Sequence, residues 1–164
     1  MHPKRETRGV KPMKEKVLKG VLLPYWRLTR GMTVGVQAVI TKAQDQVLLI
    51  RHGYRPGWHF PGGGVEWRET LLTALAREVE EETGVVVRGE PRLHGLFANF
   101  QTSPSDHIAL YVVRDWEQRQ VPPPSLEIRE QRFFPLTDLP AELVRGPRRR
   151  LEEIFEGHPI GQHW

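Results

Sequence analysis

Residues 63–85 read GGVEWRETLLTALAREVEEETGV, and this stretch sets the frame for the rest of the chain. Within it we predict a helix over Thr70–Thr83, because apolar residues recur at positions i, i+3, i+4 and i+7. Those residues are Leu72, Leu75, Ala76 and Val79. Gly84 follows where a helix commonly ends in a left-handed glycine. The glycines at 62–64 predict a loop whose backbone can approach a ligand closely.

The predicted helix carries three carboxylates on one stripe beside its apolar face, at Glu78, Glu81 and Glu82. Like charges at this spacing repel each other, and acidic residues in the last turn oppose the helix dipole. A solvated acidic face laced with ion pairs is one interpretation, and the helix taken alone favours it. A divalent cation such as Mg²⁺ reverses the argument, because it prefers carboxylate oxygens.

The spacing of seven residues around the helix decides between these interpretations. Gly63 is followed after five residues by Glu69, and after seven more by the run Arg77-Glu78-Val79-Glu80-Glu81-Glu82-Thr83-Gly84-Val85. Seven fixed residues at this spacing arise by chance on the order of once in a hundred million starts. The stretch resembles the signature of the Nudix hydrolase family at every specified position. A looser similarity extends over residues 33–139 and leaves out the N-terminal arm.

This resemblance implies a reaction and a set of site residues. The implied reaction is the Mg²⁺-dependent hydrolysis of a phosphoanhydride bond in a nucleoside diphosphate linked to another group, with Mn²⁺ able to substitute. The implied metal ligands, which are also catalytic, are Glu78, Glu81 and Glu82, joined by the backbone carbonyl of Gly63. Glu69 and Arg77 are implied to tie the loop to the helix and so to orient those ligands.

Family members often recruit a further acidic residue from a downstream loop, as a general base or an additional ligand. Glu127 and Glu130 are the best-placed candidates for this catalytic role, and Asp106 is the third. The alternative for each is an ordinary surface carboxylate, since acidic residues are mostly exposed.

Basic and aromatic residues before the glycine loop are candidates for substrate binding. Arg51 and Arg55, with His52 between them, either face substrate phosphates or form a solvated strand end. Trp58 either stacks on a base or belongs to the core, where large aromatic side chains are usually found.

The remaining pattern predicts an α/β (α+β) fold in which a mixed β-sheet is flanked by helices. Strands are expected over residues 33–41, 47–51, 85–87, 93–100, 107–114 and 128–134, with a turn at 44–46 and loops at 53–64 and 122–124. A closing helix is expected over Pro147–Phe155, where Arg148, Arg149 and Arg150 are predicted to form a solvated face. Residues 32–164 are expected to be one domain.

The N-terminal arm, residues 1–31, holds nine basic and two acidic residues, which gives it a net charge of +7. Since the whole chain has a net charge of +4, residues 32–164 have a net charge of −3. It is either a solvated tail or a contact for nucleic acid or an anionic membrane surface. Residues 14–29 have the pattern of an amphipathic helix interrupted by Pro24. Its apolar side is expected to cover part of the sheet or a partner, as in a homodimer. There is no cysteine and no apolar run of ~20 residues that could span a bilayer, so a cytoplasmic location is expected.

Three functions compete. The first is a pyrophosphohydrolase of a small nucleotide, the second an RNA 5′-end pyrophosphohydrolase whose basic arm holds RNA, and the third a non-catalytic nucleotide-binding regulator. The complete carboxylate set argues against the third, because a pure binder has no need of that repulsion. Residues 97–102 lack the proline of ADP-ribose-cleaving relatives and the tyrosine of dinucleoside-polyphosphate members, so the sequence does not identify the substrate.

Overall fold

The computed structural model describes residues 31–43 and 45–164. The amphipathic helix expected at 14–29, the arm up to residue 30, and Gln44 of the expected turn lie outside them. The elements are β1 (Thr33–Lys42), β2 (Gln46–His52), α3 (Leu71–Thr83), β3 (Val85–Val87), β4 (Arg92–Ala98), β5 (Asp106–Val113), β6 (Trp116–Gln118), β7 (Ile128–Pro135) and α4 (Arg145–Phe155). The predicted elements are confirmed with small shifts at their ends.

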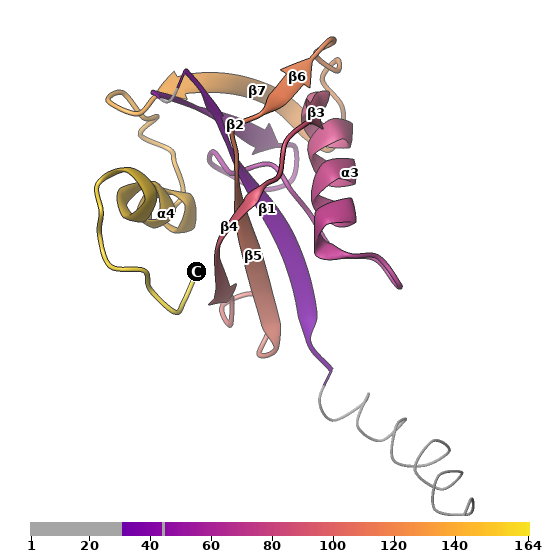
Figure 1. Ribbon diagram of the computed structural model, residues 1–164, viewed down its shortest axis with the longest axis vertical. Helices are drawn as coiled ribbons and strands as arrows, with labels where there is room; N and C mark the ends of the chain where they lie inside the picture. The colour runs from indigo at the N-terminus through magenta and orange to yellow at the C-terminus, as the bar shows by residue number, and fades with distance from the viewer. Residues whose placement is uncertain (1–30, 44) are drawn as a thin grey trace, which may run out of the picture. The chain divides into compact units, whose positions relative to one another are not determined.

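A five-stranded mixed sheet forms the centre of the domain that the structure describes, with strand order β4-β5-β1-β2-β7 (Figure 1). β1 and β5 run parallel, from Thr33 opposite Asp106 to Ile40 opposite Val113. The other neighbours in the sheet pair antiparallel. β3 and β6 form a separate two-stranded ribbon. The expected mixed α/β sheet flanked by helices is therefore correct.

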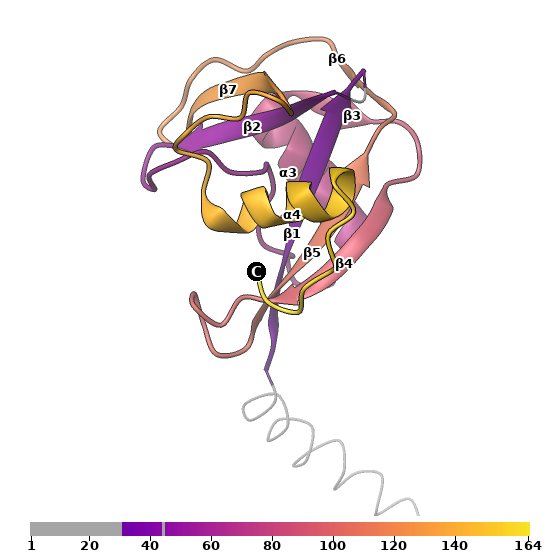
Figure 2. The same cartoon turned by 90° about the vertical axis from the view of Figure 1, so that its left-hand side faces the viewer.

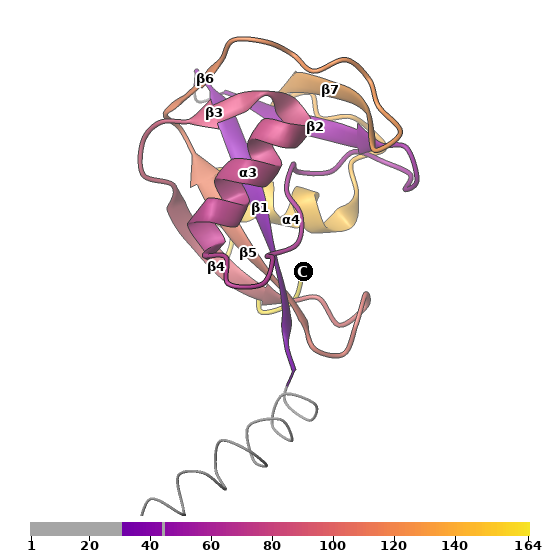
Figure 3. The same ribbon diagram turned by 90° about the vertical axis from the view of Figure 1, so that its right-hand side faces the viewer.

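Both faces of the sheet are buried, each under one helix, because apolar residues alternate along the central strands. Val36, Ala38 and Ile40 of β1 pack with Leu75 and Val79 of α3 in one core cluster. Val39, on the opposite face of β1, belongs to a second cluster that contains Leu151 of α4. Figure 2 shows α4 in front of the sheet, and Figure 3 shows α3 covering the other side.

α3 has well-defined ends. Thr70 caps it by accepting a hydrogen bond from the Thr73 N–H, and Gly84 ends it in the left-handed region at φ 72°. A Cβ at Gly84 would lie 2.1 Å from the Gln120 carbonyl oxygen, so a side chain is excluded there on two grounds.

Three details differ from the sequence-based expectation. The buried stripe of α3 runs through Leu75, Val79 and Glu82, whereas Leu72 and Ala76 are exposed. Glu82 therefore lies on the core face rather than beside it, because a carboxylate and an apolar residue at i, i+3 share one side of a helix. The sequence does not predict β6, because Trp116-Glu117-Gln118 lacks the run of β-branched residues that marks β3 at the same length. No helix among the described residues is long and apolar enough to cross a membrane.

Candidate active site

The glycine loop lies along β1 and is fixed to it by backbone hydrogen bonds. The Val36 N–H donates to the Gly63 carbonyl and the Ala38 N–H donates to the Pro61 carbonyl, both at 2.9 Å. Gly62 has φ 139°, and a Cβ on it would lie 2.1 Å from the Val36 carbonyl oxygen. Only glycine permits this approach.

The loop also touches the carboxylates of α3. The Gly62 N–H donates to Glu82 Oε2 at 2.6 Å, and a Cβ at Gly63 would lie 2.5 Å from the Glu78 carboxyl group. The Gly63 carbonyl, expected as a metal ligand, already accepts the Val36 hydrogen bond, and a carbonyl oxygen has a second lone pair. The loop therefore presents backbone polar groups to the helix at the place where the carboxylates gather.

Arg77 and Glu69 are joined as expected. Arg77 Nε and Nη2 donate to the two oxygens of Glu69 at 3.0 and 2.9 Å, a bidentate pair that fixes both side chains. These hydrogen bonds lower the pKa of Glu69 below its ordinary value, and the Glu66 N–H adds to the effect. Arg77 Nη2 also donates to the Gly64 carbonyl at 3.2 Å, so the arginine bridges the loop and the helix.

The same arginine reaches two of the candidate ligands. Arg77 Nη1 donates to Glu78 Oε1 at 2.8 Å and lies 3.6 Å from Glu81 Oε2. The guanidinium group of Arg77 thus lies beside Glu78 and Glu81 and offsets part of the repulsion between the carboxylates along the helix.

Glu82 differs from both, because it is buried and has no ion-pair partner within 4.0 Å among the described residues. Its side chain keeps one hydrogen bond, from Gly62. The pKa of Glu82 is raised from 4.5 to about 8, mainly by burial. The charges of Glu78 and Glu127 contribute to this rise, while the Gly62 hydrogen bond and the charge of Arg55 oppose it. A buried carboxyl surrounded by other carboxylates is poised to gain from a cation.

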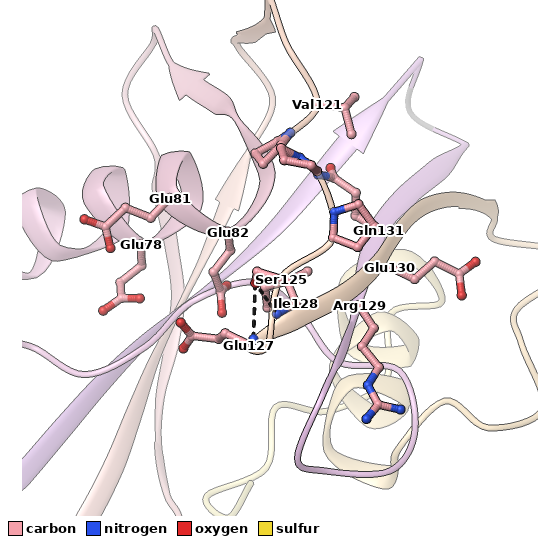
Figure 4. A pocket seen from close by; sticks show the side chains of 13 residues that line it. Glu78, Glu81, Glu82, Val121, Ser125, Glu127, Ile128, Arg129, Glu130 and Gln131 are labelled. Carbon is pink, nitrogen blue, oxygen red and sulfur yellow. Dashed lines mark hydrogen bonds between the residues drawn. The ribbon is translucent and has the colours of Figure 1, made fainter.

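A cavity of about 290 Å³ collects the acidic candidates from two elements (Figure 4). Glu78, Glu81 and Glu82 come from α3, whereas Glu127 and Glu130 lie just before and within β7. Figure 4 shows Glu127 turned toward Glu82 and Glu130 extending away from the helix. The opposite wall is the loop from Val121 to Ser125, which contains three consecutive prolines. We call this the carboxylate pocket.

Asp106 is not part of this pocket. Its two carboxylate oxygens accept hydrogen bonds from Thr33 Oγ1 at 2.7 Å and from Asn99 Nδ2 at 2.6 Å, at the start of β5. These contacts give it a structural task in the turn that precedes the strand.

The donor set fits a hard divalent cation in its chemistry. The ligands available are carboxylate and carbonyl oxygens, which Mg²⁺ prefers. Among the described residues no basic side chain lies within 4.0 Å of the buried Glu82 carboxyl. In the side-chain positions seen here, no three acidic or histidine side chains of the described residues converge closely enough to enclose an ion. Glu78 and Glu81 would hold a cation together with Glu82 if their carboxyl groups turned away from Arg77.

Of the candidate substrate-binding residues, Trp58 belongs to the core, which corrects the base-stacking alternative. It is 5% exposed and packs edge-on against Phe134 at 4.8 Å between ring centroids. Arg51 covers the Trp58 ring and forms an ion pair with Glu142. Arg55 is exposed and has no carboxylate partner within 4.0 Å in the part of the chain that the structure describes.

Two arginines lie in places that the sequence does not predict. Arg129, which stands between Glu127 and Glu130, lines the carboxylate pocket and a neighbouring cavity, although no motif in the sequence marks it. Arg150, expected on a solvated helix face, is fully buried against the Phe97 ring, 4.0 Å from its centroid.

Comparison with known proteins agrees with this geometry. The family profile described as NUDIX domain matches residues 31–154, and the chain belongs to this family. It is a Nudix hydrolase, and hydrolases of this family act on nucleotide pyrophosphates.

Three relatives give the range of similarity. An ADP-ribose pyrophosphatase of Methanocaldococcus jannaschii is 30% identical over 130 residues, which cover 77% of this chain and 75% of the relative. An RNA pyrophosphohydrolase of Coxiella burnetii is 35% identical over 94 residues, covering 57% of this chain and 34% of that protein. The crystal structure of a MutT NUDIX hydrolase from Burkholderia pseudomallei aligns with a TM-score of 0.65 and 27% identity, over 74% of this chain and 97% of that one.

Proposed function

We propose that this protein hydrolyses a phosphoanhydride bond in a small nucleotide, a nucleoside diphosphate linked to another group, with Mg²⁺ as cofactor and in the cytoplasm. The observation that carries the proposal is the burial of Glu82 in one pocket with Glu78, Glu81 and Glu127. No basic side chain of the described residues lies within 4.0 Å of the Glu82 carboxyl. A folded protein keeps such a destabilising arrangement where function requires it.

The three glutamates of α3 would hold the cation, with the Gly63 carbonyl as a further oxygen ligand. When bound, a divalent cation neutralises charge on the phosphate oxygens and acidifies a bound water. Arg77 and Glu69 hold the loop and helix together, so that the ligands and the loop backbone keep one geometry.

Glu127 is the proposed general base. In hydrolysis a water oxygen bonds to phosphorus, the bridging P–O bond breaks, and the leaving phosphate takes the electron pair. The water proton passes to the Glu127 carboxylate, which faces the glutamates of α3 (Figure 4). Its backbone is anchored, since the Gly53 N–H donates to its carbonyl at 2.8 Å and its own N–H donates to Ser125 Oγ at 3.2 Å.

A matched pair of variants tests this role. Glu127→Gln is expected to lower kcat by about 10²–10⁴-fold, the range for loss of a general base. Glu130→Gln alters a carboxyl of the same pocket that turns away from the helix, so its kcat is expected to stay within about threefold of wild type. The assay is release of phosphate from a panel of nucleotide pyrophosphates with Mg²⁺.

The family ligands are tested in the same panel. Glu81→Gln and Glu82→Gln should each remove most turnover while the protein stays folded, as judged by circular dichroism. Mg²⁺ should raise the melting temperature of wild type but not of the triple Glu78/Glu81/Glu82→Gln variant, since a ligand that binds only the native state stabilises it. Full activity in a folded variant that carries both Glu81→Gln and Glu82→Gln would contradict the proposal.

A second candidate is pyrophosphohydrolysis at the 5′ end of RNA. The partial similarity to an RNA pyrophosphohydrolase and the +7 charge of residues 1–31 favour it. Deleting residues 1–13 should leave turnover of a small nucleotide nearly unchanged. If the same deletion strongly lowers turnover of 5′-triphosphorylated RNA, the arm serves RNA and the second candidate gains.

A further inference from the structure

A second cavity, of about 380 Å³, adjoins the carboxylate pocket. Its walls are the segment from Arg51 to Gly57, together with Arg129 and Glu142. We call it the arginine pocket. Arg129 lines both cavities, so the two cavities meet at this side chain.

A β-bulge places Arg129 at this junction. Arg51 pairs with Glu130 and His52 pairs with Ile128, which leaves Arg129 as the extra residue in β7. Bulges re-aim side chains and are common next to active sites. The same short segment therefore presents Glu127 to the carboxylate pocket and Arg129 to the arginine pocket.

Gly53 allows the two walls to meet. A Cβ on it would lie 2.1 Å from the Leu126 carbonyl oxygen and 3.5 Å from Arg129 Nε. With glycine there, the Gly53 N–H reaches the Glu127 carbonyl at 2.8 Å, which ties the 53–57 loop to the bulge. The backbone segments that carry Arg55 and Arg129 are thus held against each other.

The charges of this pocket are only partly neutralised. Arg51 pairs with Glu142. Arg55 contacts His52 Nε2 and the Tyr54 hydroxyl, each at 3.4 Å, and within residues 31–43 and 45–164 neither Arg55 nor Arg129 has a carboxylate within 4.0 Å. Burial, followed by the charges of Arg55 and His59, lowers the pKa of His52 to about 4, in keeping with a local excess of positive charge.

We propose that Arg55 and Arg129 bind a third phosphate of a small nucleotide, one beyond the two that flank the cleaved bond. This inference rests on the proposed function. Guanidinium groups suit phosphate because they donate two parallel hydrogen bonds to its oxygens. A cavity of about 380 Å³ exceeds the needs of one phosphate and leaves room for the group attached to it. Substrates with only a diphosphate would leave both guanidinium groups without an anion.

The test compares dinucleoside diphosphate, triphosphate and tetraphosphate substrates that share the same nucleoside. In wild type, kcat/KM is expected to rise about tenfold or more from the diphosphate to the triphosphate, since tenfold corresponds to about 1.4 kcal/mol, a modest share of a charge-assisted contact. Arg129→Ala and Arg55→Ala should each bring that ratio close to one, and Arg129→Lys should keep part of it. Arg119→Ala, which alters a highly exposed arginine lining another cavity, is the control and should keep the wild-type ratio.

A binding measurement separates this inference from the proposed function. Calorimetric titration with inorganic tripolyphosphate and pyrophosphate, in Mg²⁺, does not need turnover. A preference for tripolyphosphate that Arg129→Ala removes supports the arginine pocket even if no nucleotide is hydrolysed. Equal affinity for both anions in wild type, or an equal loss for both in Arg129→Ala, overturns it. A preference seen only with 5′-triphosphorylated over 5′-diphosphorylated oligonucleotides would overturn the small-nucleotide source and assign the third phosphate to RNA.

Discussion

The two helices lie on opposite faces of one sheet, and each buries a charged side chain, but the surroundings of the two charges are opposite. Glu82 of α3 has other carboxylates near it and one backbone hydrogen bond. Arg150 of α4 has an ion pair with Glu153, 2.7 Å between Nη2 and Oε1. The pKa of both groups shifts toward the neutral form, because burial is the largest cause in each case.

The partners of Arg150 extend the contrast. Glu153 also contacts His94 Nε2 at 2.9 Å and accepts a hydrogen bond from the Gly161 N–H at 2.9 Å. The tail beyond α4 runs beside β4, where the Ala98 N–H donates to Gln162 and the Trp164 N–H donates to Ala98. Through Glu153, the ion pair of α4 thus contacts a strand and the tail, whereas Glu82 of α3 faces a cavity. A buried charge that is paired serves the fold, and one left among like charges indicates a ligand.

The largest effect on stability is expected from disrupting the buried ion pair between Arg150 and Glu153 of α4. Arg150→Ala leaves Glu153 buried without its cation, and the free energy of unfolding should fall by about 3–5 kcal/mol. Urea unfolding measures it. Arg145→Ala, at an exposed position of the same helix, is the control and should change stability by less than about 0.5 kcal/mol.

A double variant checks the cause of that loss. If the unpaired charge is responsible, Arg150→Met combined with Glu153→Gln should recover part of the stability, because both charges are then gone. A loss in the double variant as large as in Arg150→Ala would indicate packing against Phe97 and Trp164 instead.

The contrast also shows what sequence can predict. The loop and the helix follow from local patterns within 23 residues, and the Glu69–Arg77 pair follows from the family resemblance of the same stretch. Arg150 stands in a run of three arginines that is typical of a solvated face, and its burial depends on Phe97 and on the tail, which are distant in sequence. The prediction that Leu72 and Ala76 lie on the buried face of the helix is wrong for a related reason. The periodicity of apolar residues predicts a helix, but the packing against the sheet decides which face of that helix is buried.

The site could be predicted as far as its residues share one segment. Arg129 depends on a bulge created by the pairing of β2 with β7, and the burial of Trp58 depends on Phe134 across the same pair of strands. Neither has a local pattern.

A smaller effect on stability is expected from Glu82, the buried charge without an ion-pair partner among the described residues. It should appear as a dependence of the free energy of unfolding on pH. The raised pKa of Glu82 means that the folded state keeps a proton between pH 4.5 and about 8 that the unfolded state has released. Its contribution to stability is therefore fully present below pH 4.5 and is lost as the pH rises toward 8. In EDTA, wild type should lose on the order of 1–3 kcal/mol relative to Glu82→Gln between pH 5 and 9.

Metal should reverse this loss, because a cation favours the charged carboxylate. With Mg²⁺ added, the difference between wild type and Glu82→Gln at high pH should shrink or change sign. Parallel pH profiles of the two proteins in EDTA would show that Glu82 titrates normally and that the two buried charges do not differ in the way argued here.

The smallest effect is expected at Gly161, beside the Arg150–Glu153 pair, and it is informative because a glycine beside the carboxylates of α3 should behave differently. An alanine Cβ at Gly161 would meet the tips of Arg149 and Arg150 at 3.2 and 3.3 Å, and long side chains can yield by a few tenths of an ångström. Its N–H still donates to Glu153, so Gly161→Ala should cost less than about 1 kcal/mol in urea unfolding and leave turnover unchanged. At Gly63 the same methyl group would lie 2.5 Å from the Glu78 carboxyl, which Arg77 holds at 2.8 Å. Gly63→Ala must therefore displace a proposed ligand, and its signature should be lost turnover with little lost stability. If instead Gly161→Ala lowers turnover and Gly63→Ala does not, the division between a structural charge on α4 and a functional charge on α3 is wrong.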